Sequence, residues 1–228
     1  MRPYNQVEIE KKEINNKLYY KNTIVLVYTI RYPRFSSNWF IRATKVMNKY
    51  YEEMALKFKA HCEVELFNTA VKDYDFNKSN GYPIRQYEAF MDYTITYNQN
   101  CAVSLYVDKY EFTGGAHGNT VQTSNTWSLK KCATITLGSM FPTNKNYVED
   151  IKKEINRQIA EQMIADKNIY FENYKKLVDE YFNENSFYIS PANLVVYFQQ
   201  YEIAPYSSGI PTFSIPFTKV NAIPPNCR

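Results

Sequence analysis

Three of the six glycines in the chain fall in one short stretch between two runs of alternating residues. Before the stretch, Val103, Leu105 and Val107 alternate with polar or aromatic side chains, and Val121–Trp127 alternates in the same way after it. A two-residue period is typical of antiparallel strands with one buried face. The stretch Thr113–Gly118 therefore predicts the turn of a β-hairpin, in which glycine supplies positive φ angles.

The rest of the chain alternates between helical and strand patterns. Apolar residues from Trp39 to Phe58 recur at steps of three and four, which predicts an amphipathic helix capped by Ser36 or Ser37 and running to about Ala70. Two more helices are predicted at Tyr147–Lys167 and Tyr170–Phe182. The predicted strands are Val7–Glu13, Leu18–Tyr20, Thr23–Tyr32, Tyr82–Tyr97, Ala102–Phe112, Asn119–Leu129, Leu194–Phe198 and Thr212–Phe217.

Breaks between these elements are also predicted. Asn15-Asn16 reads as a turn, Pro33 as the end of a strand and Asn77–Gly81 as a loop. The pattern predicts an α+β fold, with antiparallel sheets packed against helices in two lobes. The first lobe is 7–143 (strands, a long helix, antiparallel strands) and the second is 144–220 (helices, then short strands).

Charge and hydropathy exclude two kinds of partner. The net charge of +4 is mild, and Lys and Arg are scattered among acids, whereas nucleic-acid binding requires a clustered basic face. The longest apolar runs, such as Ile24–Ile30, are far shorter than the roughly 20 residues that cross a bilayer, so no transmembrane segment is expected. Met1–Gln6 does not read as a signal peptide. We expect a chain that is cytosolic or lacks its export signal or anchor.

Four cysteines bear on that choice, namely Cys62, Cys101, Cys132 and Cys227. They form no C-x-x-C pair and have no histidine at zinc-finger spacing, which argues against a structural metal site. Four unpaired buried thiols remain one reading. In an exported chain disulfides are favoured, and Cys101 and Cys132, at the outer ends of the predicted hairpin, are the preferred pair.

The two histidines leave few routes to catalysis. His61 reads as a solvated surface residue, while His117 lies in the glycine turn. His117 is a candidate general base if Asp108 or Glu111 orients it, or a loop residue that bonds backbone groups. No nucleophile-elbow, zinc-protease or phosphate-loop motif is present. The sequence predicts no catalytic residue, no cofactor and no metal site.

The segment Tyr197–Gly209 is the second informative stretch. Pro205 fixes its own φ and pushes Ala204 towards an extended form, so Tyr206 can be displayed at low entropic cost. Such a tyrosine suits an interface anchor. A structural role for this tyrosine in its loop is the equal alternative.

These residues together resemble a known pair of domains. The resemblance spans about residues 7–220, and the glycine turn with the Glu-Ile-Ala-Pro-Tyr segment is its most specific part. The matching positions are Tyr32-Pro33, Asn48, Ser104-Leu105, Tyr110, Gly114–Gly118, Leu137, Phe141, Val196–Phe198, Tyr201–Tyr206, Gly209 and Ile215–Phe217. The chain is similar to the domains of unknown function DUF4163 and DUF3298, which occur in RsiV-like lysozyme-sensing anti-sigma factors and before some polysaccharide deacetylase domains.

The resemblance implies an exported α+β domain with no catalytic activity of its own. It implies recognition of a protein such as c-type lysozyme at the bacterial surface, on a secreted chain or a surface lipoprotein. The expected binding residues are Tyr110, Gly114, Gly115, His117, Tyr201, Pro205 and Tyr206. Binding of cell-wall glycan (peptidoglycan) and hydrolysis through His117 are the two alternatives.

Overall fold

The chain forms two compact units, and the computed structural model describes residues 5–227 of it. The helix-covered unit comprises Glu8–Tyr93 and Val107–Val121. The disulfide-linked unit comprises the described residues up to Val7, then Thr94–Tyr106, then the described residues from Gln122 onward. The units thus alternate along the sequence. The division between residues 143 and 144 stays a prediction about chain organisation, since the units in space are not two consecutive stretches.

A long hairpin opens the helix-covered unit. β1 (Glu8–Tyr20) and β2 (Thr23–Ser36) pair antiparallel along their whole lengths. Lys21 and Asn22 form its two-residue turn and both have positive φ, as in the type I′ turns that match strand twist. The predicted turn at Asn15-Asn16 is wrong, because these residues lie inside β1 and are paired with β2.

β2 continues through Pro33, where the sequence predicted its end. It pairs with β3 (Tyr87–Gln99) only over Leu26–Ile30. Beyond that, Asn48 replaces a strand: its side chain accepts the N–H of Phe35 at 2.7 Å and donates to the Phe35 carbonyl at 2.9 Å. Pro33 lies two residues earlier, so its missing N–H falls on the same edge and removes no bond to β1.

One continuous helical segment joins β2 to β3. It consists of α1 (Ile41–His61), a π-helical turn η1 (Cys62–Leu66) and α2 (Phe67–Asn80). Four buried residues follow one another at steps of four: Cys62, Leu66, Ala70 and Tyr74. The wider π turn helps to keep such a series on one face. The predicted end near Ala70 and the predicted loop at residues 77–81 are therefore wrong, and the segment ends at the left-handed Gly81.

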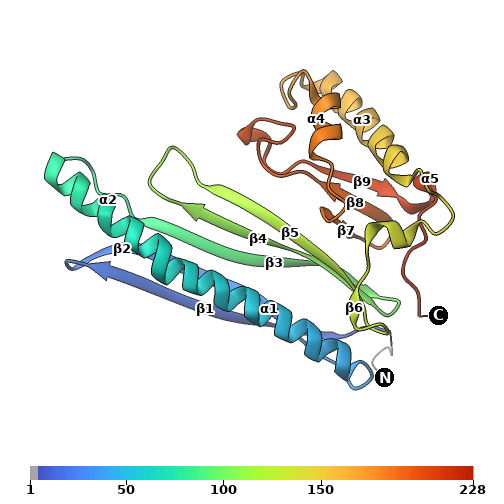
Figure 1. The fold of residues 1–228 in the computed structure, drawn as a ribbon, viewed down its shortest axis with the longest axis horizontal. Coiled ribbons are helices and arrows are strands. Elements are labelled where there is room, and N and C mark those ends of the chain that lie inside the picture. Colours follow the sequence, from blue (N-terminus) through green and yellow to red (C-terminus); the bar gives the residue numbers. More distant parts are fainter. Residues whose placement is uncertain (1–4, 228) are drawn as a thin grey trace. The chain divides into compact units, whose positions relative to one another are not determined.

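The large sheet has the strand order β1-β2-β3-β4-β5-β6, where β4 is Ala102–Phe112, β5 is Asn119–Ser128 and β6 is Ala133–Thr134. In the helix-covered unit the helical segment runs along this sheet (Figure 1). Because a helical connection returns the chain to the same end, β2 and β3 are parallel. The α+β class is confirmed, and the expectation of purely antiparallel sheets is corrected at this one pair.

The disulfide-linked unit carries a second sheet of three antiparallel strands, β7 (Phe187–Ile189), β8 (Asn193–Tyr197) and β9 (Thr212–Pro216). Its helices are α3 (Tyr147–Ala165), α4 (Tyr174–Tyr181) and α5 (Phe217–Val220), with short 3₁₀ turns η2 (Leu137–Met140) and η3 (Tyr206–Ser208). The buried residues of α3 share one apolar core with β7, β8 and β9. The sequence predicted α3, α4, β8 and β9. It did not predict β7, α5 or the two 3₁₀ turns, which are too short to show a period.

Four of the described polar residues are buried in this unit, namely Ser104, Gln122, Thr126 and Glu154. Ser104 of β4 shares a hydrogen bond with Thr126 at 2.8 Å and accepts the N–H of Ile189 at 3.0 Å. Glu154 of α3 accepts two hydrogen bonds from Arg157, at 2.7 and 2.9 Å. The Arg157 hydrogen bonds outweigh the effect of burial and lower the pKa of Glu154 to about 2.

Candidate functional site

The predicted glycine turn is a loop held by one arginine. Gly114 has a φ of +85°, a conformation that side chains disfavour. Arg85, which precedes β3, donates from Nη1 to the carbonyl oxygens of Gly114 and, at 3.0 Å, Gly115. Both peptide groups therefore face a guanidinium group, which fixes the loop next to the segment before β3.

Tyr110 and Gly118 explain a second part of the motif. A Cβ atom at Gly118 would lie 2.3 Å from the Tyr110 ring, so only glycine fits there. The Phe90 ring of β3 also stacks on the Tyr110 ring, and the ring centroids are 6.0 Å apart. Tyr110, predicted as a binding residue, thus has a packing role between β3 and the loop.

His117 is exposed in this loop, and its Nδ1 lies 2.9 Å from the Gly118 carbonyl oxygen. This contact agrees with the backbone-bonding alternative of the sequence analysis. His61, by contrast, is half-buried between two carboxylates, Glu65 at 2.7 Å and Glu111 at 3.0 Å. Burial lowers the pKa of His61, but its hydrogen bonds to the two carboxylates outweigh burial and raise it overall.

A hollow of about 500 Å³, the glycine-loop hollow, lies beside the loop. Its lining comes from the end of α2, the segment before β3, the start of β3 and the loop: Asp73, Phe76, Asn77, Tyr82, Pro83, Arg85, Tyr87, Thr113 and Gly114. Of the predicted binding residues, Gly114 lines it. The other lining residues were not predicted. Residues 77–81 were expected to form a polar loop, whereas the exposed end of helix α2 presents Asp73, Phe76 and Asn77 to the hollow.

Two exposed rings stand in this hollow. Phe76 is 61% exposed and Tyr82 is 57% exposed, and their centroids are 6.2 Å apart. Tyr82 follows the left-handed Gly81, and its N–H donates to the Asn77 carbonyl at 2.9 Å, so the end of α2 holds this ring in place. An exposed aromatic pair at a hollow is apolar surface that folding leaves open to a ligand.

The polar groups of the hollow have different charges. Within the described residues, Arg85 has no carboxylate within ion-pair distance, and its hydrogen bonds go to carbonyl oxygens. Asp73 accepts a hydrogen bond from the Tyr87 hydroxyl. Burial and then this bond raise the pKa of Tyr87. The hollow therefore offers a cation, a carboxylate and an amide around two rings.

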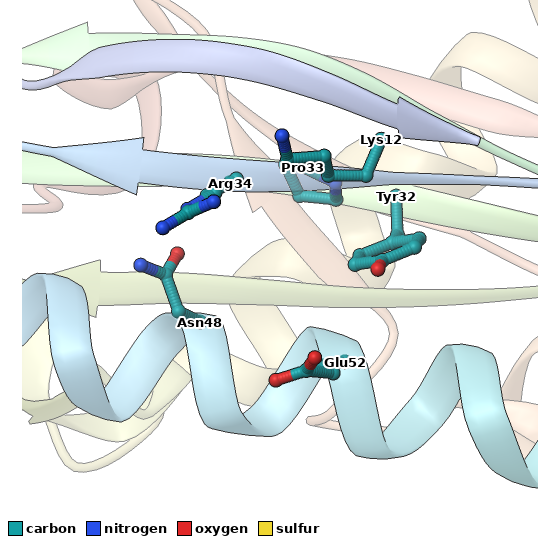
Figure 2. Close-up of a pocket in the computed structure, with 6 residues that line it drawn as sticks. All are labelled: Lys12, Tyr32, Pro33, Arg34, Asn48 and Glu52. Atoms are coloured by element: carbon teal, nitrogen blue, oxygen red, sulfur yellow. The ribbon is translucent and has the colours of Figure 1, made fainter.

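A second hollow, the strand–helix pocket, lies between β2 and α1 and measures about 230 Å³. Figure 2 shows Lys12, Tyr32, Pro33 and Arg34 on the strands, with Asn48 and Glu52 on the helix. Lys12 pairs with Glu10 at 2.6 Å, and Asn48 is bonded to Phe35. Asn48 thus fastens α1 to β2, and two of the pocket's polar side chains, Lys12 and Asn48, are bonded within the protein.

The loop after β8 contains the remaining predicted site residues. The rings of Tyr201 and Tyr206 have centroids 5.8 Å apart, and Tyr201 is the more exposed of the two. Pro205 lines an open hollow of about 910 Å³ with Ile164 and Phe171. This loop belongs to the disulfide-linked unit, whereas the glycine loop belongs to the helix-covered unit.

Several motif residues in this loop support the fold. Ile203 and Ala204 are buried in the core, and half-buried Glu202 accepts the N–H of Gln199 at 2.7 Å. Gln199 also forms a two-way amide clamp with Gln122 of β5, at 2.7 and 2.9 Å. No local sequence pattern predicts this pair of hydrogen bonds, because Gln122 and Gln199 are far apart in the chain.

The disulfide differs from the predicted one. Cys101 bonds to Cys227, while Cys62 and Cys132 are free thiols. Cys101 lies in the tight turn between β3 and β4, and its carbonyl accepts the N–H of Leu129. Cys132 directly precedes β6, which pairs on the other side of β5, so the Cys101–Cys132 prediction is wrong. The partner of Cys101 is Cys227, which lies outside the predicted hairpin.

Three further observations concern a shifted pKa, metal binding and membrane-spanning helices. Burial and then the neighbouring Asp92 raise the pKa of Asp108 in β4 to about 6. Among the described residues no three His, Cys, Asp or Glu side chains are grouped so as to hold a metal ion. In the same part of the chain no helix is both long and apolar enough to span a bilayer.

Two family models match the chain. Residues 19–120 match the model described as "Deacetylase PdaC", and residues 139–218 match "Protein of unknown function (DUF3298)". Over 124 residues the chain is 25% identical to the peptidoglycan-N-acetylmuramic acid deacetylase PdaC of Bacillus subtilis. The match covers 54% of this chain and 23% of that relative.

Two solved structures share the fold. A DUF3298 family member from Bacteroides fragilis superposes with a TM-score of 0.70 at 17% identity, over 96% of this chain and 93% of its own. A DUF3298 family protein from Pseudomonas aeruginosa gives a TM-score of 0.61 at 15% identity, over 98% and 96%. At these identities the likeness establishes the architecture alone.

The comparisons correct one prediction and refine another. The prediction that the chain is not an enzyme is corrected, because a family model described as a deacetylase matches residues 19–120 and a relative named as a deacetylase is 25% identical over 124 residues. The predicted DUF3298 domain is confirmed over residues 139–218, and the segment before it is PdaC-like.

Proposed function

We propose that this chain acts in the bacterial cell wall, where it binds peptidoglycan glycan at the glycine-loop hollow and thereby supports deacetylation. The proposal starts from the combination of a PdaC-like segment with a DUF3298 domain. One observation carries the proposal, namely the exposed ring pair Phe76 and Tyr82 at a polar hollow inside the PdaC-like segment. Sugar rings present an apolar face of C–H groups with hydroxyls at the edge. That pattern suits an aromatic platform surrounded by hydrogen-bonding groups.

The charges of the hollow refine the substrate class. A muramic acid unit without its stem peptide carries a free lactyl carboxylate, which Arg85 can bind because no acidic side chain of the described residues neutralises it. Asn77 and Thr113 are suited to the hydroxyl and acetamido groups. We therefore expect fragments with such muramic acid units to bind more tightly than neutral chitin fragments of equal length.

An extracytoplasmic location is part of the proposal. The Cys101–Cys227 disulfide supports it, because such bonds persist in oxidising compartments. The wall-directed relative supports it as well.

Titration calorimetry of the chain with soluble muropeptides tests glycan binding. Phe76→Ala and Tyr82→Ala should each weaken binding about tenfold or more, the size of a contact worth roughly 1.4 kcal/mol. Tyr19→Ala is the matched control, since Tyr19 is 59% exposed on β1 of the same unit. If all three variants bind the ligand equally tightly, the ligand does not bind in this hollow.

Acetate release from peptidoglycan, followed in parallel, tests the enzymatic part. Asp108 is the carboxyl group whose pKa of about 6 suits proton transfer near neutral pH. Release that is lost in Asp108→Asn, while muropeptide binding persists, would place the chemistry on β4. Release unchanged in that variant would assign it elsewhere.

Recognition of a surface protein, c-type lysozyme included, is the second candidate. The observation that favours it is the exposed ring of Tyr201 beside Tyr206 in the disulfide-linked unit. Calorimetry against lysozyme with Tyr201→Ala and Tyr206→Ala separates the candidates, because these residues do not line the glycine-loop hollow. If lysozyme binds and both variants bind it as tightly, the loop assignment is wrong.

A further inference from the structure

The first turns of α1 display a surface that neither the glycine-loop hollow nor the core explains. We name it the basic aromatic patch, formed by Trp39 and the exposed side chains of α1 that follow it: Ile41, Arg42, Lys45, Val46 and Lys49. The buried face of the same turns is formed by Ala43, Thr44 and Met47. The patch is therefore the outward side of an amphipathic helix start.

Its apolar part is unusually open to water. Trp39 is 73% exposed, whereas the chain's other tryptophan, Trp127, is buried. The Ser37 hydroxyl accepts the N–H groups of Trp39 and Phe40 at 3.1 and 3.2 Å, which fixes the turn that presents the indole. Ile41 and Val46 are exposed beside it. Large apolar groups held at the surface mark an interaction site.

Its charged part has one sign. No Asp or Glu occurs from Ser36 to Tyr51. Within the described residues Arg42 and Lys45 form no ion pair, and Lys49 approaches Glu53 only at 3.8 Å. Cations in the first turns of a helix are unfavourable with its dipole, so helix stability does not account for them. The partner that complements this patch is anionic.

We propose that the basic aromatic patch docks on an anionic lipid surface. A helix that lies in a membrane interface combines an aromatic anchor and aliphatic residues with cations, as this patch does. The cations reach phosphate groups while Trp39, Ile41 and Val46 enter the boundary with the acyl chains. An anionic polymer in water would neutralise the cations but leave the aliphatic Ile41 and Val46 hydrated, so the lipid surface complements both parts.

Trp39 reports its own environment. In a full chain with Trp127→Phe, Trp39 is the remaining tryptophan, and its emission should shift to the blue on addition of phosphatidylglycerol–phosphatidylcholine vesicles. Vesicles of phosphatidylcholine alone should give no shift. Raising the salt from about 0.1 to about 0.5 M should weaken binding, because the cations contribute through screened attraction.

Vesicle sedimentation then measures affinity without a fluorophore. Arg42→Gln and Lys45→Gln should each weaken binding about fivefold, corresponding to roughly 1 kcal/mol for a cation near an anionic surface. Trp39→Ala should weaken it about tenfold. Two kinds of control lie in the other unit: Lys175→Gln and Lys176→Gln each match the charge change of one patch variant, and Ile164→Ser removes an apolar group that is 84% exposed.

The outcomes separate the proposal from its competitors. Losses confined to the patch variants, with the controls unchanged, support lipid docking. No association with phosphatidylglycerol vesicles overturns it, as do equal losses in the Lys175→Gln and Lys176→Gln controls. A shift of Trp39 emission with soluble muropeptide but not with vesicles also overturns it, and leaves the glycine-loop hollow to be judged by Phe76 and Tyr82 alone.

Discussion

The two units of the molecule use their polar residues in opposite ways. In the disulfide-linked unit polar groups are drawn inward: Ser104 joins three strands, Glu154 is buried under Arg157, and Gln199 clamps Gln122. In the helix-covered unit cations and rings are turned outward, at Arg85, at the Phe76–Tyr82 pair and on the first turns of α1. The disulfide-linked unit thus uses these polar groups to hold its own elements together, and the helix-covered unit carries the two surfaces for which we propose binding.

The largest expected effect breaks the disulfide-linked unit. Replacing Cys101 and Cys227 by Ser should lower its free energy of unfolding by about 4 kcal/mol, because the bond joins residues 126 apart in sequence and restricts the unfolded chain. Fluorescence of the buried Trp127 during urea unfolding measures the loss.

Cys132→Ser is the control, because this thiol is free and should cost little. Amide exchange in α1 follows the helix-covered unit in the same samples and should remain slow. A cost for Cys132→Ser equal to that of Cys101→Ser would mean that the observed pairing is not the one that stabilises the unit.

A smaller effect tests the helix-covered unit. Gly118→Ala forces the Tyr110 ring aside and should cost about 1–3 kcal/mol, the usual range for overpacking. At Gly115 an added Cβ meets its nearest atom at 3.8 Å, so Gly115→Ala should be nearly neutral. Thermal unfolding of the two variants measures the difference. Equal melting temperatures would show that the loop moves freely away from Tyr110.

The smallest expected effect is the dependence of the free energy of unfolding on pH, which has opposite signs in the two units. The lowered pKa of Glu154 stabilises the disulfide-linked unit above about pH 4.5, and this contribution is lost as the pH falls towards 2. The raised pKa of His61 stabilises the helix-covered unit below pH 6.5, and this contribution is lost as the pH rises through the higher folded-state value.

Each contribution should be of the order of 1 kcal/mol or less, since the partners are partly hydrated. Urea unfolding across pH should lose its acid limb in Glu154→Gln and its neutral-to-alkaline limb in His61→Asn. An alkaline limb that survives in His61→Asn would assign it to another group.

Local patterns predicted most of the elements, because such patterns depend only on residues that are close in sequence. The alternation around Thr113–Gly118 and the apolar stripes of α1 and α3 each depend on neighbours within a few residues. The errors arose where distant contacts decide. Asn15-Asn16 stays in a strand because β2 pairs with it, and α2 extends to Asn80 because its buried residues continue to Tyr74.

The candidate site was less predictable than the fold. The glycine loop was found from composition, yet its role depends on Arg85 and Tyr110, which approach it only in the folded sheet. Phe76 and Tyr82 were not predicted as site residues, because Phe76 is an isolated aromatic residue beside the predicted loop and Tyr82 was expected to begin a strand, whereas β3 begins at Tyr87. The Cys101–Cys227 pair depends on where the chain end returns, and no local pattern reports that.

The interleaving of the units also sets an order of events during synthesis. All residues of the helix-covered unit have been made by Val121, so this unit can enclose Cys62 early. Cys101 must wait until Cys227 has been made, and in the interval Cys132 is the other accessible thiol among the described residues. Cys101–Cys132 is then the pairing that competes with the native bond, because the early burial of Cys62 removes the pairings that would involve it.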